Sequence, residues 1–383
     1  MNNNENTNKT TETGEENALC TYAPIFSSFG TDSAKDIILG KFNGLPVRLD
    51  LNNAPNRHIC LIGSSGCGKT FEALSIIRQI VTNGGRVLAL ESHGSLSKAD
   101  VSKVFNEDNE SLCNHIWAVD EGIPCGILYP ITYPDGTTET RGDVAEAFTG
   151  IITKSYNLGI RQRAALRKAT EKAFRLSHNT SETLNTIERI LESGNRSATA
   201  VAEILHPLFD HKYFVDGISA FSPHKFNLIH LDKISPDVQE AIPEIMISLV
   251  WRLANAGVFK DYPLWLFVDE FQNYGTRSNN ALAQLISEGR KLGVNLILGS
   301  QLILQNTDKA VQQRVSQCGL MLYGKPMATR ISQEANMINR ADPTPWFSAL
   351  KNLKVGQFVA VGNYCIGQRP IDYPIVIDAR VKT

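Results

Sequence analysis

The stretch Gly63-Ser64-Ser65-Gly66-Cys67-Gly68-Lys69-Thr70 lies between an apolar run at residues 58–62 and a segment of helical spacing that stops at Gly84-Gly85. It matches the phosphate-binding loop pattern at every fixed position. Glycines allow the backbone N–H groups to converge on phosphates, and the following helix directs the positive end of its dipole at them. The whole stretch is therefore predicted to bind ATP, with Lys69 at the β- and γ-phosphates and the Thr70 hydroxyl as a Mg²⁺ ligand. An ordinary glycine-rich turn is the alternative interpretation.

Outward from this loop, short apolar runs alternate with segments of helical spacing. The runs that we expect to be strands lie at residues 58–62, 86–91, 226–231, 264–268, 294–299 and 319–323. Such alternation predicts an α/β fold with a mainly parallel sheet covered by helices. Two further apolar stretches, at residues 357–361 and 374–377, are expected to complete the sheet.

Three segments depart from this pattern. Residues 1–17 are poor in apolar side chains and are expected to form a disordered tail. Residues 18–56 contain Asn43-Gly44 between two apolar runs, which predicts a small β-hairpin lid. Residues 57–383 would form the main domain, and the stretch at about 143–210 has helical spacing with little strand signal, which predicts an all-helical insertion.

The composition excludes several classes of protein. Hydrophobic residues make up 42% of the 383 and charged residues 20%, as in soluble domains. The net charge of −1 excludes a histone-like coat of cations, although a few cations in a channel remain able to grip nucleic acid. No apolar run approaches the ~18 to 20 residues of a membrane span and no signal peptide is visible, so we expect a cytoplasmic protein. Seven cysteines without a Cys-x-x-Cys pair argue against a disulfide framework or a zinc knuckle.

Two acidic residues follow the expected strand at residues 264–268. Asp269 and Glu270 would lie at the carboxyl edge of the sheet, where ligands of such folds collect. Asp269 is expected to hold the Mg²⁺ shell, and Glu270 to polarise the attacking water. Carboxylates that merely end a strand in solvent are the alternative.

Two more candidates flank the next strand, at residues 294–299. Gln301 follows it and carries a neutral amide, which is suited to sensing the γ-phosphate or positioning water, or simply to capping the strand. Arg290 precedes it in the last turn of an expected helix, where a cation also favours the helix dipole.

Together these residues resemble a known family. The strand ending in Asp269-Glu270, then Glu288-Gly289-Arg290-Lys291, then Ser300-Gln301, is similar to the HerA/FtsK superfamily of ring ATPases, and to HerA-type DNA translocases in particular. Members of that type end their second strand in Asp-x-His-Gly-Glu, and this chain has Glu91-Ser92-His93-Gly94-Ser95 there. The resemblance extends from about Leu39 to Ile377.

The resemblance implies a RecA-like ATPase that assembles into a homohexamer and acts on DNA. ATP sites of the superfamily lie between subunits, and Arg290, eleven residues before Gln301, would enter the neighbouring site as a catalytic arginine. A nuclease or other effector is an implied partner, although the β-barrel that usually precedes the HerA motor is not evident. The alternatives are an ATP-dependent ring scaffold that activates an antiviral effector, and a motor of the type IV secretion or conjugation type.

A DNA motor also needs cations on loops that face its pore. Arg277, in the polar loop after the acidic pair, is the first candidate, and Lys98 and Lys103 are weaker ones. Solvated surface charges are the alternative for all three.

Overall fold

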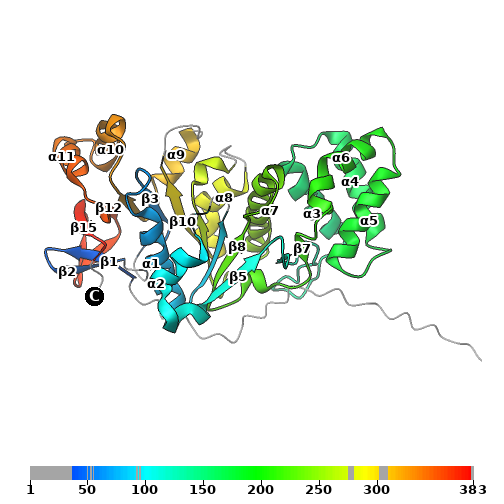
Figure 1. Ribbon diagram of the computed structural model, residues 1–383, viewed down its shortest axis with the longest axis horizontal. Coiled ribbons are helices and arrows are strands. Elements are labelled where there is room, and N and C mark those ends of the chain that lie inside the picture. The colour runs from blue at the N-terminus through cyan, green and yellow to red at the C-terminus, as the bar shows by residue number, and fades with distance from the viewer. Residues whose placement is uncertain are drawn as a thin grey trace, which may run out of the picture.

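The computed structural model describes residues 37–49, 51, 54, 56–91, 94, 96–274, 280–301 and 309–380. Within this part of the chain a 13-stranded sheet runs through the molecule in the order β14-β13-β2-β1-β15-β12-β11-β3-β10-β9-β4-β8-β5 (Figure 1). The expected α/β fold with helices around a large sheet is confirmed. The tail expected at residues 1–17 lies outside the described residues.

The run of strands from β11 to β5 is parallel, and it forms the centre of the fold. Because helices pack on both faces, almost every residue of the inner strands is buried and their sequences are continuously apolar. The carboxyl ends of these strands all meet at one edge of the sheet. The strands are β11 (Leu320–Tyr323), β3 (Ile59–Ile62), β10 (Val294–Ser300), β9 (Leu264–Val268), β4 (Arg86–Glu91), β8 (Phe226–His230) and β5 (Cys113–Trp117).

The other run of strands is antiparallel and extends the same sheet beyond β11. The predicted hairpin is present, with Asn43 and Gly44 both at positive φ, but β1 pairs with β15. The hairpin is therefore an integral part of the large sheet. These strands are β12 (Gln357–Gly362), β15 (Ile375–Asp378), β1 (Ile37–Phe42), β2 (Leu45–Leu49), β13 (Tyr364–Ile366) and β14 (Arg369–Ile371).

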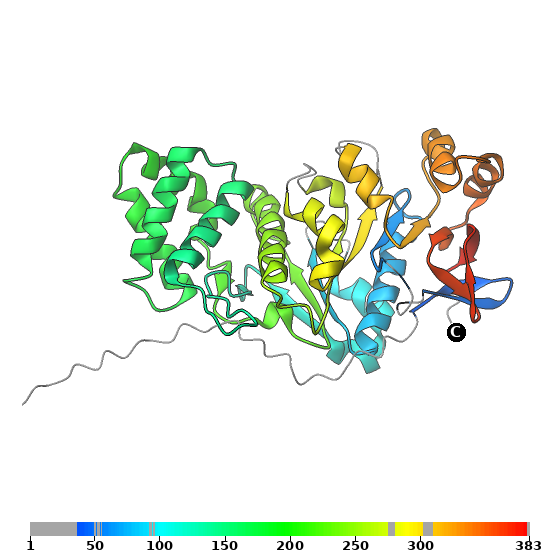
Figure 2. The ribbon, with the colours of Figure 1, turned by 180° about the vertical axis from the view of Figure 1, so that it is seen from behind.

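Two sets of helices cover the two faces of the parallel strands. Ile59 and Leu61 of β3 pack with α1 (Lys69–Thr82) and α2 (Lys98–Asn109), whereas Cys60 and Ile62 belong to the core under α7 (Pro236–Asn255) and α8 (Ala281–Glu288). This alternation follows from the two-residue period of a strand. Figure 2 shows the α7 and α8 face from behind. No helix in the described ranges is both long and apolar enough to cross a bilayer.

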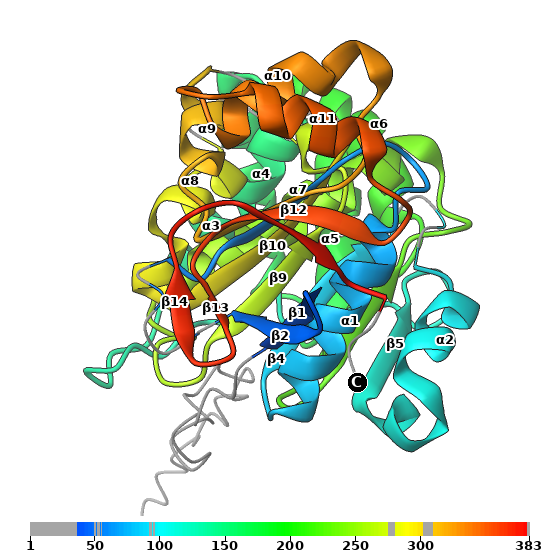
Figure 3. The ribbon, with the colours of Figure 1, turned by 90° about the vertical axis from the view of Figure 1, so that its left-hand side faces the viewer.

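The remaining helices gather at the two ends of the molecule, except for one that packs against α8 (Figure 1). Four helices occupy residues 141–209, close to the range expected for the helical insertion, and they lie beyond α7 (Figure 1). They are α3 (Arg141–Ser155), α4 (Ile160–Ala173), α5 (Thr180–Glu192) and α6 (Arg196–Phe209), beside a small sheet of β6 (Ile123–Pro124) and β7 (Phe214–Val215). At the opposite end, α10 (Ile331–Ile338) and α11 (Thr344–Asn352) lie above the antiparallel strands (Figure 3), and α9 (Lys309–Val315) precedes β11.

Candidate active site

The phosphate-binding loop joins β3 to α1 at the carboxyl edge of the sheet. Gly63 N–H donates to the Ser300 carbonyl at 3.2 Å, and both the backbone N–H and the hydroxyl of Ser64 donate to the Lys325 carbonyl, at 2.9 and 2.8 Å. Gly68 has a φ of 104°, and a Cβ there would lie 3.2 Å from the Gly356 nitrogen, so only glycine fits without strain. The loop is thus held by backbone contacts from both flanking segments.

Two side chains of the loop are buried. The Lys69 ammonium donates to the carbonyl of Gly63 at 2.8 Å and to that of Ser64 at 3.3 Å, so it already points into the curve of the loop. Cys67 is only 3% exposed, and burial raises the pKa of its thiol. The thiol therefore stays protonated at neutral pH.

The acidic pair lies where β9 ends. Glu270 adopts a left-handed backbone conformation with a φ of 44°, and its N–H donates to the Asp269 carboxylate at 3.0 Å. Asp269 also passes close to the neighbouring strand, because a Cβ on Gly299 would lie 2.4 Å from one of its carboxylate oxygens. Gly299 is therefore required for the Asp269 side chain to occupy its place beside β10.

Glu270 and Gln301 are in direct contact. The Gln301 side-chain amide donates to one oxygen of the Glu270 carboxylate at 2.6 Å, and its backbone N–H donates to the other at 3.1 Å. Gln272 donates to that second oxygen at 2.6 Å, and the Ser300 hydroxyl donates to the Gln272 carbonyl oxygen at 2.7 Å. The Ser300 bond turns the Gln272 amide nitrogen toward Glu270, so the carboxylate is held by two amide side chains.

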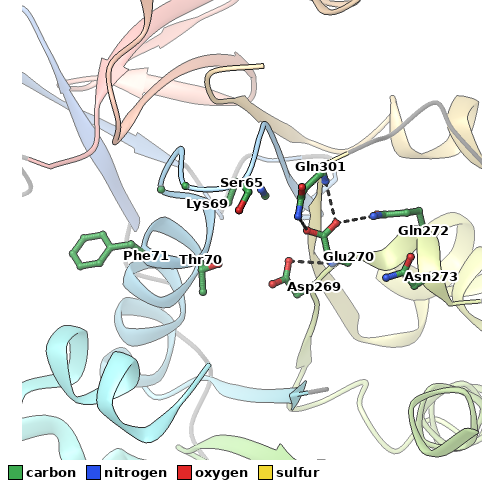
Figure 4. A pocket seen from close by; sticks show the side chains of 11 residues that line it. Ser65, Lys69, Thr70, Phe71, Asp269, Glu270, Gln272, Asn273 and Gln301 are labelled. Carbon is green, nitrogen blue, oxygen red and sulfur yellow. Dashed lines mark hydrogen bonds between the residues drawn. The ribbon is translucent and has the colours of Figure 1, made fainter. Parts of the chain in front are cut away.

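These groups surround one open pocket of about 630 Å³. Figure 4 shows Lys69 and Thr70 on one side, facing Asp269, Glu270 and Gln301 on the other. The structure thus brings the predicted loop and the predicted acidic pair together around a single cavity. The pocket is lined by Ser65, Gly66, Gly68, Lys69, Thr70, Phe71, Asp269, Glu270, Gln272, Asn273 and Gln301.

The donor set suits Mg²⁺. Thr70 offers a hydroxyl and Asp269 a carboxylate from facing sides of the pocket (Figure 4), and hard oxygen ligands of this kind are those that Mg²⁺ prefers. The remaining ligands of such an ion would come from phosphate oxygens and water. A bound Mg²⁺ would neutralise charge on the β- and γ-phosphates.

Arg290 lies at the opposite edge of the sheet, so the structure does not bring it to this pocket. It precedes β10, whereas Gln301 follows it, and seven residues of strand separate the two edges by roughly 20 Å. Burial lowers the pKa of His58, just before β3, to about 4, and the nearby Arg290 guanidinium contributes to this lowering. The exposed Arg290 lines a second cavity of about 380 Å³ with three other cations, Arg57, Lys260 and Lys291.

The three DNA candidates have different surroundings. Arg277 lies outside the described residues. Lys98 is exposed at the start of α2, and the described residues provide it with no ion pair. Lys103 forms an ion pair with Asp100 at 2.8 Å on the same helix, which makes it the weaker candidate.

Sequence reasoning did not single out three side chains of the pocket, Phe71, Gln272 and Asn273. Gln272 lies in a short 3₁₀ turn after Glu270, and Phe71 directly follows Thr70.

The loop after β4 corresponds to the Asp-x-His-Gly-Glu segment of the resemblance. The buried Glu91 carboxylate accepts a hydrogen bond from the Leu96 N–H, so Glu91 supports this loop. Ser92, His93 and Ser95 are not among the described residues.

Comparison with known sequences gives one family. A family model described as the central domain of helicase HerA matches residues 37–250. The DNA double-strand break repair helicase HerA of Sulfolobus acidocaldarius is 22% identical over 289 residues, covering 70% of this chain and 56% of that protein. A probable helicase of Methanocaldococcus jannaschii is 21% identical over 345 residues, covering 82% of this chain and 62% of that one. The chain thus spans less than two thirds of the length of either relative.

Solved structures share the fold over most of the chain. The solved chain of VirB4 of Thermoanaerobacter pseudethanolicus superposes with a TM-score of 0.63 at 16% identity, covering 91% of this chain and 97% of that chain. The plasmid coupling protein TrwB, in complex with the non-hydrolysable ATP analogue ADPNP, gives a TM-score of 0.55 at 15% identity, covering 85% of this chain and 86% of the solved chain. The fold is therefore the RecA-like one that the sequence predicted.

Proposed function

Because this chain belongs to the HerA central-domain family, within the HerA/FtsK superfamily of P-loop ATPases, we propose that it is an ATP-driven ring motor that moves along or remodels DNA. The observation that carries the proposal is the placement of its charged and polar side chains. Lys69, Asp269, Glu270 and Gln301 surround one pocket, while Arg290 lies at the far edge of the same sheet. The pocket thus has the groups for phosphate binding and water activation, and it lacks a catalytic arginine of its own among the described residues.

Glu270 and Gln301 would work in sequence during hydrolysis. The Gln301 amide donates to the Glu270 carboxylate. A γ-phosphate is a competing acceptor for that amide, and its arrival would free a carboxylate oxygen to accept a proton from the attacking water. The Lys69 ammonium would then stabilise the negative charge that develops on the phosphate oxygens.

The position of Arg290 supports a ring. A second copy placed with its Arg290 edge against this pocket would supply a planar, permanently charged guanidinium to the transferring phosphoryl group. We propose a homohexamer on the basis of the superfamily resemblance, and a cytoplasmic location because ATP and DNA are available there. A nuclease or other effector remains a proposed partner.

The deciding experiment compares ATP hydrolysis with and without duplex DNA. A motor should hydrolyse ATP faster on DNA and displace a bound roadblock in an ATP-dependent manner. A ring scaffold for an effector would bind ATP and its partner without displacing the roadblock. A secretion-type motor would respond to a protein cargo instead.

DNA binding should weaken steeply with salt and depend little on sequence, despite the net charge of −1. Replacing Arg277 by alanine should make the slope of log affinity against log salt shallower by about one unit for each phosphate that the protein no longer neutralises. Filter binding at several salt concentrations measures this slope. Lys103→Ala is the matched control, because Asp100 already neutralises that ammonium, and it should change the slope less. An unchanged slope for Arg277→Ala would remove Arg277 from the DNA path.

Gln272→Ala should lower kcat roughly ten-fold and leave KM for ATP nearly unchanged, because it removes a charge-assisted bond that orients Glu270. Steady-state kinetics at saturating DNA measure both constants. Asn273→Ala is the control, since Asn273 lines the same pocket without a side-chain bond to Glu270. Equal kinetics for the two variants would show that Gln272 does not position the carboxylate.

A further inference from the structure

One aromatic side chain of the pocket is exposed without an evident structural reason. Phe71 is 55% exposed, although its helix neighbours Lys69 and Glu72 are 8% and 1% exposed. Large apolar side chains in a helix normally face the core, and an exposed one inside a ligand pocket marks a contact surface for the ligand. Phe71 is one of the side chains that line the pocket.

Phe71 lies at the end of the pocket that is farther from the acidic pair (Figure 4). Figure 4 shows Glu270 and Gln301 at one side of the pocket, Phe71 at the opposite side, and Lys69 and Thr70 between them. The γ-phosphate must lie beside Glu270, where water attacks. The α-phosphate and the nucleoside attached to it must therefore extend toward Phe71.

A second exposed apolar side chain lies near the same end of the loop. Gly356 N–H donates to the Cys67 carbonyl at 2.9 Å, and a Cβ on Gly68 would approach the Gly356 nitrogen within 3.2 Å. Val355 directly precedes Gly356 and is 62% exposed. Gly68 and Gly356 are therefore in contact, and each has an exposed apolar side chain near it in sequence. Phe71 lies one helical turn after Gly68, and Val355 lies one residue before Gly356.

We propose that Phe71 is the base subsite of the nucleotide pocket, with its ring stacked on the purine and Val355 beside it. This inference rests on the proposed function, because it assumes a nucleoside triphosphate in the pocket. Stacking uses the π-face that every base has and does not read the hydrogen-bonding edge. The subsite therefore accepts adenine and guanine alike, and it adds affinity without taking part in the chemistry.

The test measures the binding of three probes, ATP, GTP and inorganic tripolyphosphate, each with Mg²⁺, by isothermal titration calorimetry. Phe71→Ala should weaken ATP and GTP roughly ten-fold or more and leave tripolyphosphate unchanged, because tripolyphosphate has no base to stack. Phe71→Trp should retain the affinity of the wild type. In turnover, Phe71→Ala should raise KM and leave kcat unchanged. Tyr373→Ala is the control, since Tyr373 is 54% exposed and does not line the pocket.

Three results would overturn the subsite. Equal weakening of ATP and tripolyphosphate would mean that Phe71 only supports the loop. If Phe71→Ala keeps its ATP affinity but no longer assembles into the ring of subunits, as measured by light scattering, Phe71 is a contact between subunits. A loss of GTP affinity without a loss of ATP affinity would exclude simple stacking. If DNA fails to stimulate hydrolysis, the motor proposal fails, but the three affinities still decide the subsite.

Discussion

Lys69→Ala should remove most nucleotide binding, whereas Glu270→Gln should bind ATP normally and hydrolyse it at least ~10²-fold more slowly. The difference follows from the two sides of the pocket. The Lys69 ammonium lies inside the curve of the loop, bonded to the carbonyl oxygens of Gly63 and Ser64, where phosphate oxygens would replace them. Glu270 lies across the pocket, and its amide replacement keeps the shape of the side chain but loses the charge that polarises water.

A fluorescent ATP analogue measures binding, and single-turnover hydrolysis measures the chemical step. Lys325→Ala is the control for removing a cation near the loop, because Lys325 holds Ser64 through its backbone carbonyl only. Its ATP affinity should match that of the wild type. If Lys69→Ala and Glu270→Gln lose binding to the same extent, Glu270 is not the residue that activates water.

Arg290→Ala should abolish hydrolysis, and its activity should return on mixing with Lys69→Ala, which is also inactive. Arg290 lies roughly one strand length from the pocket of its own chain, so it has to serve another subunit if it serves ATP at all. A Lys69→Ala subunit cannot hold ATP but still presents Arg290, and an Arg290→Ala subunit has the converse defect. Mixed rings contain some interfaces with both residues intact.

Arginines that act in this way contribute on the order of 10³-fold to phosphoryl transfer, so even a minority of rebuilt sites should exceed the activity of either parent. The mixture must be shown to contain hetero-oligomers, for example by co-purification through a tag on one variant. Lys291→Ala is a matched control, since Lys291 is next to Arg290 in the same cavity. No recovery in verified hetero-oligomers would mean that Arg290 acts within its own chain or only stabilises its helix.

The sequence predicted the parallel centre of the fold because its strands are buried on both faces and are therefore continuously apolar. It did not predict β5, whose residues Cys113, Asn114, His115 and Trp117 are only half-buried because β5 pairs with β8 alone at the edge of the sheet. The sequence also did not predict β13 and β14. Each has only three residues, and the two pair with each other across a short turn. Edge and turn-defined strands have little hydrophobic periodicity to detect.

For the candidate site as well, the sequence predicted some features and not others. The loop and the acidic pair could be placed together because both follow parallel strands, whose carboxyl ends share one edge. The contacts among Glu270, Gln272 and Gln301 depend on side-chain directions and on the left-handed backbone of Glu270, which no spacing rule contains. The exposure of Phe71 in the first turn of α1 is likewise a property of the assembled pocket.

Strand β10 connects the position of Arg290 to the position of Gln301. All seven of its residues are buried, and it pairs with β3 on one side and β9 on the other. Gln301 is attached to one end and Arg290 precedes the other. In a ring of such subunits, the arrival or departure of the γ-phosphate would displace Gln301. Strand β10 would transmit this displacement to Arg290, which would then move relative to the nucleotide of the next subunit. Hydrolysis around the ring would then proceed in order from one subunit to its neighbour, because β10 would couple each ATP site to the next one.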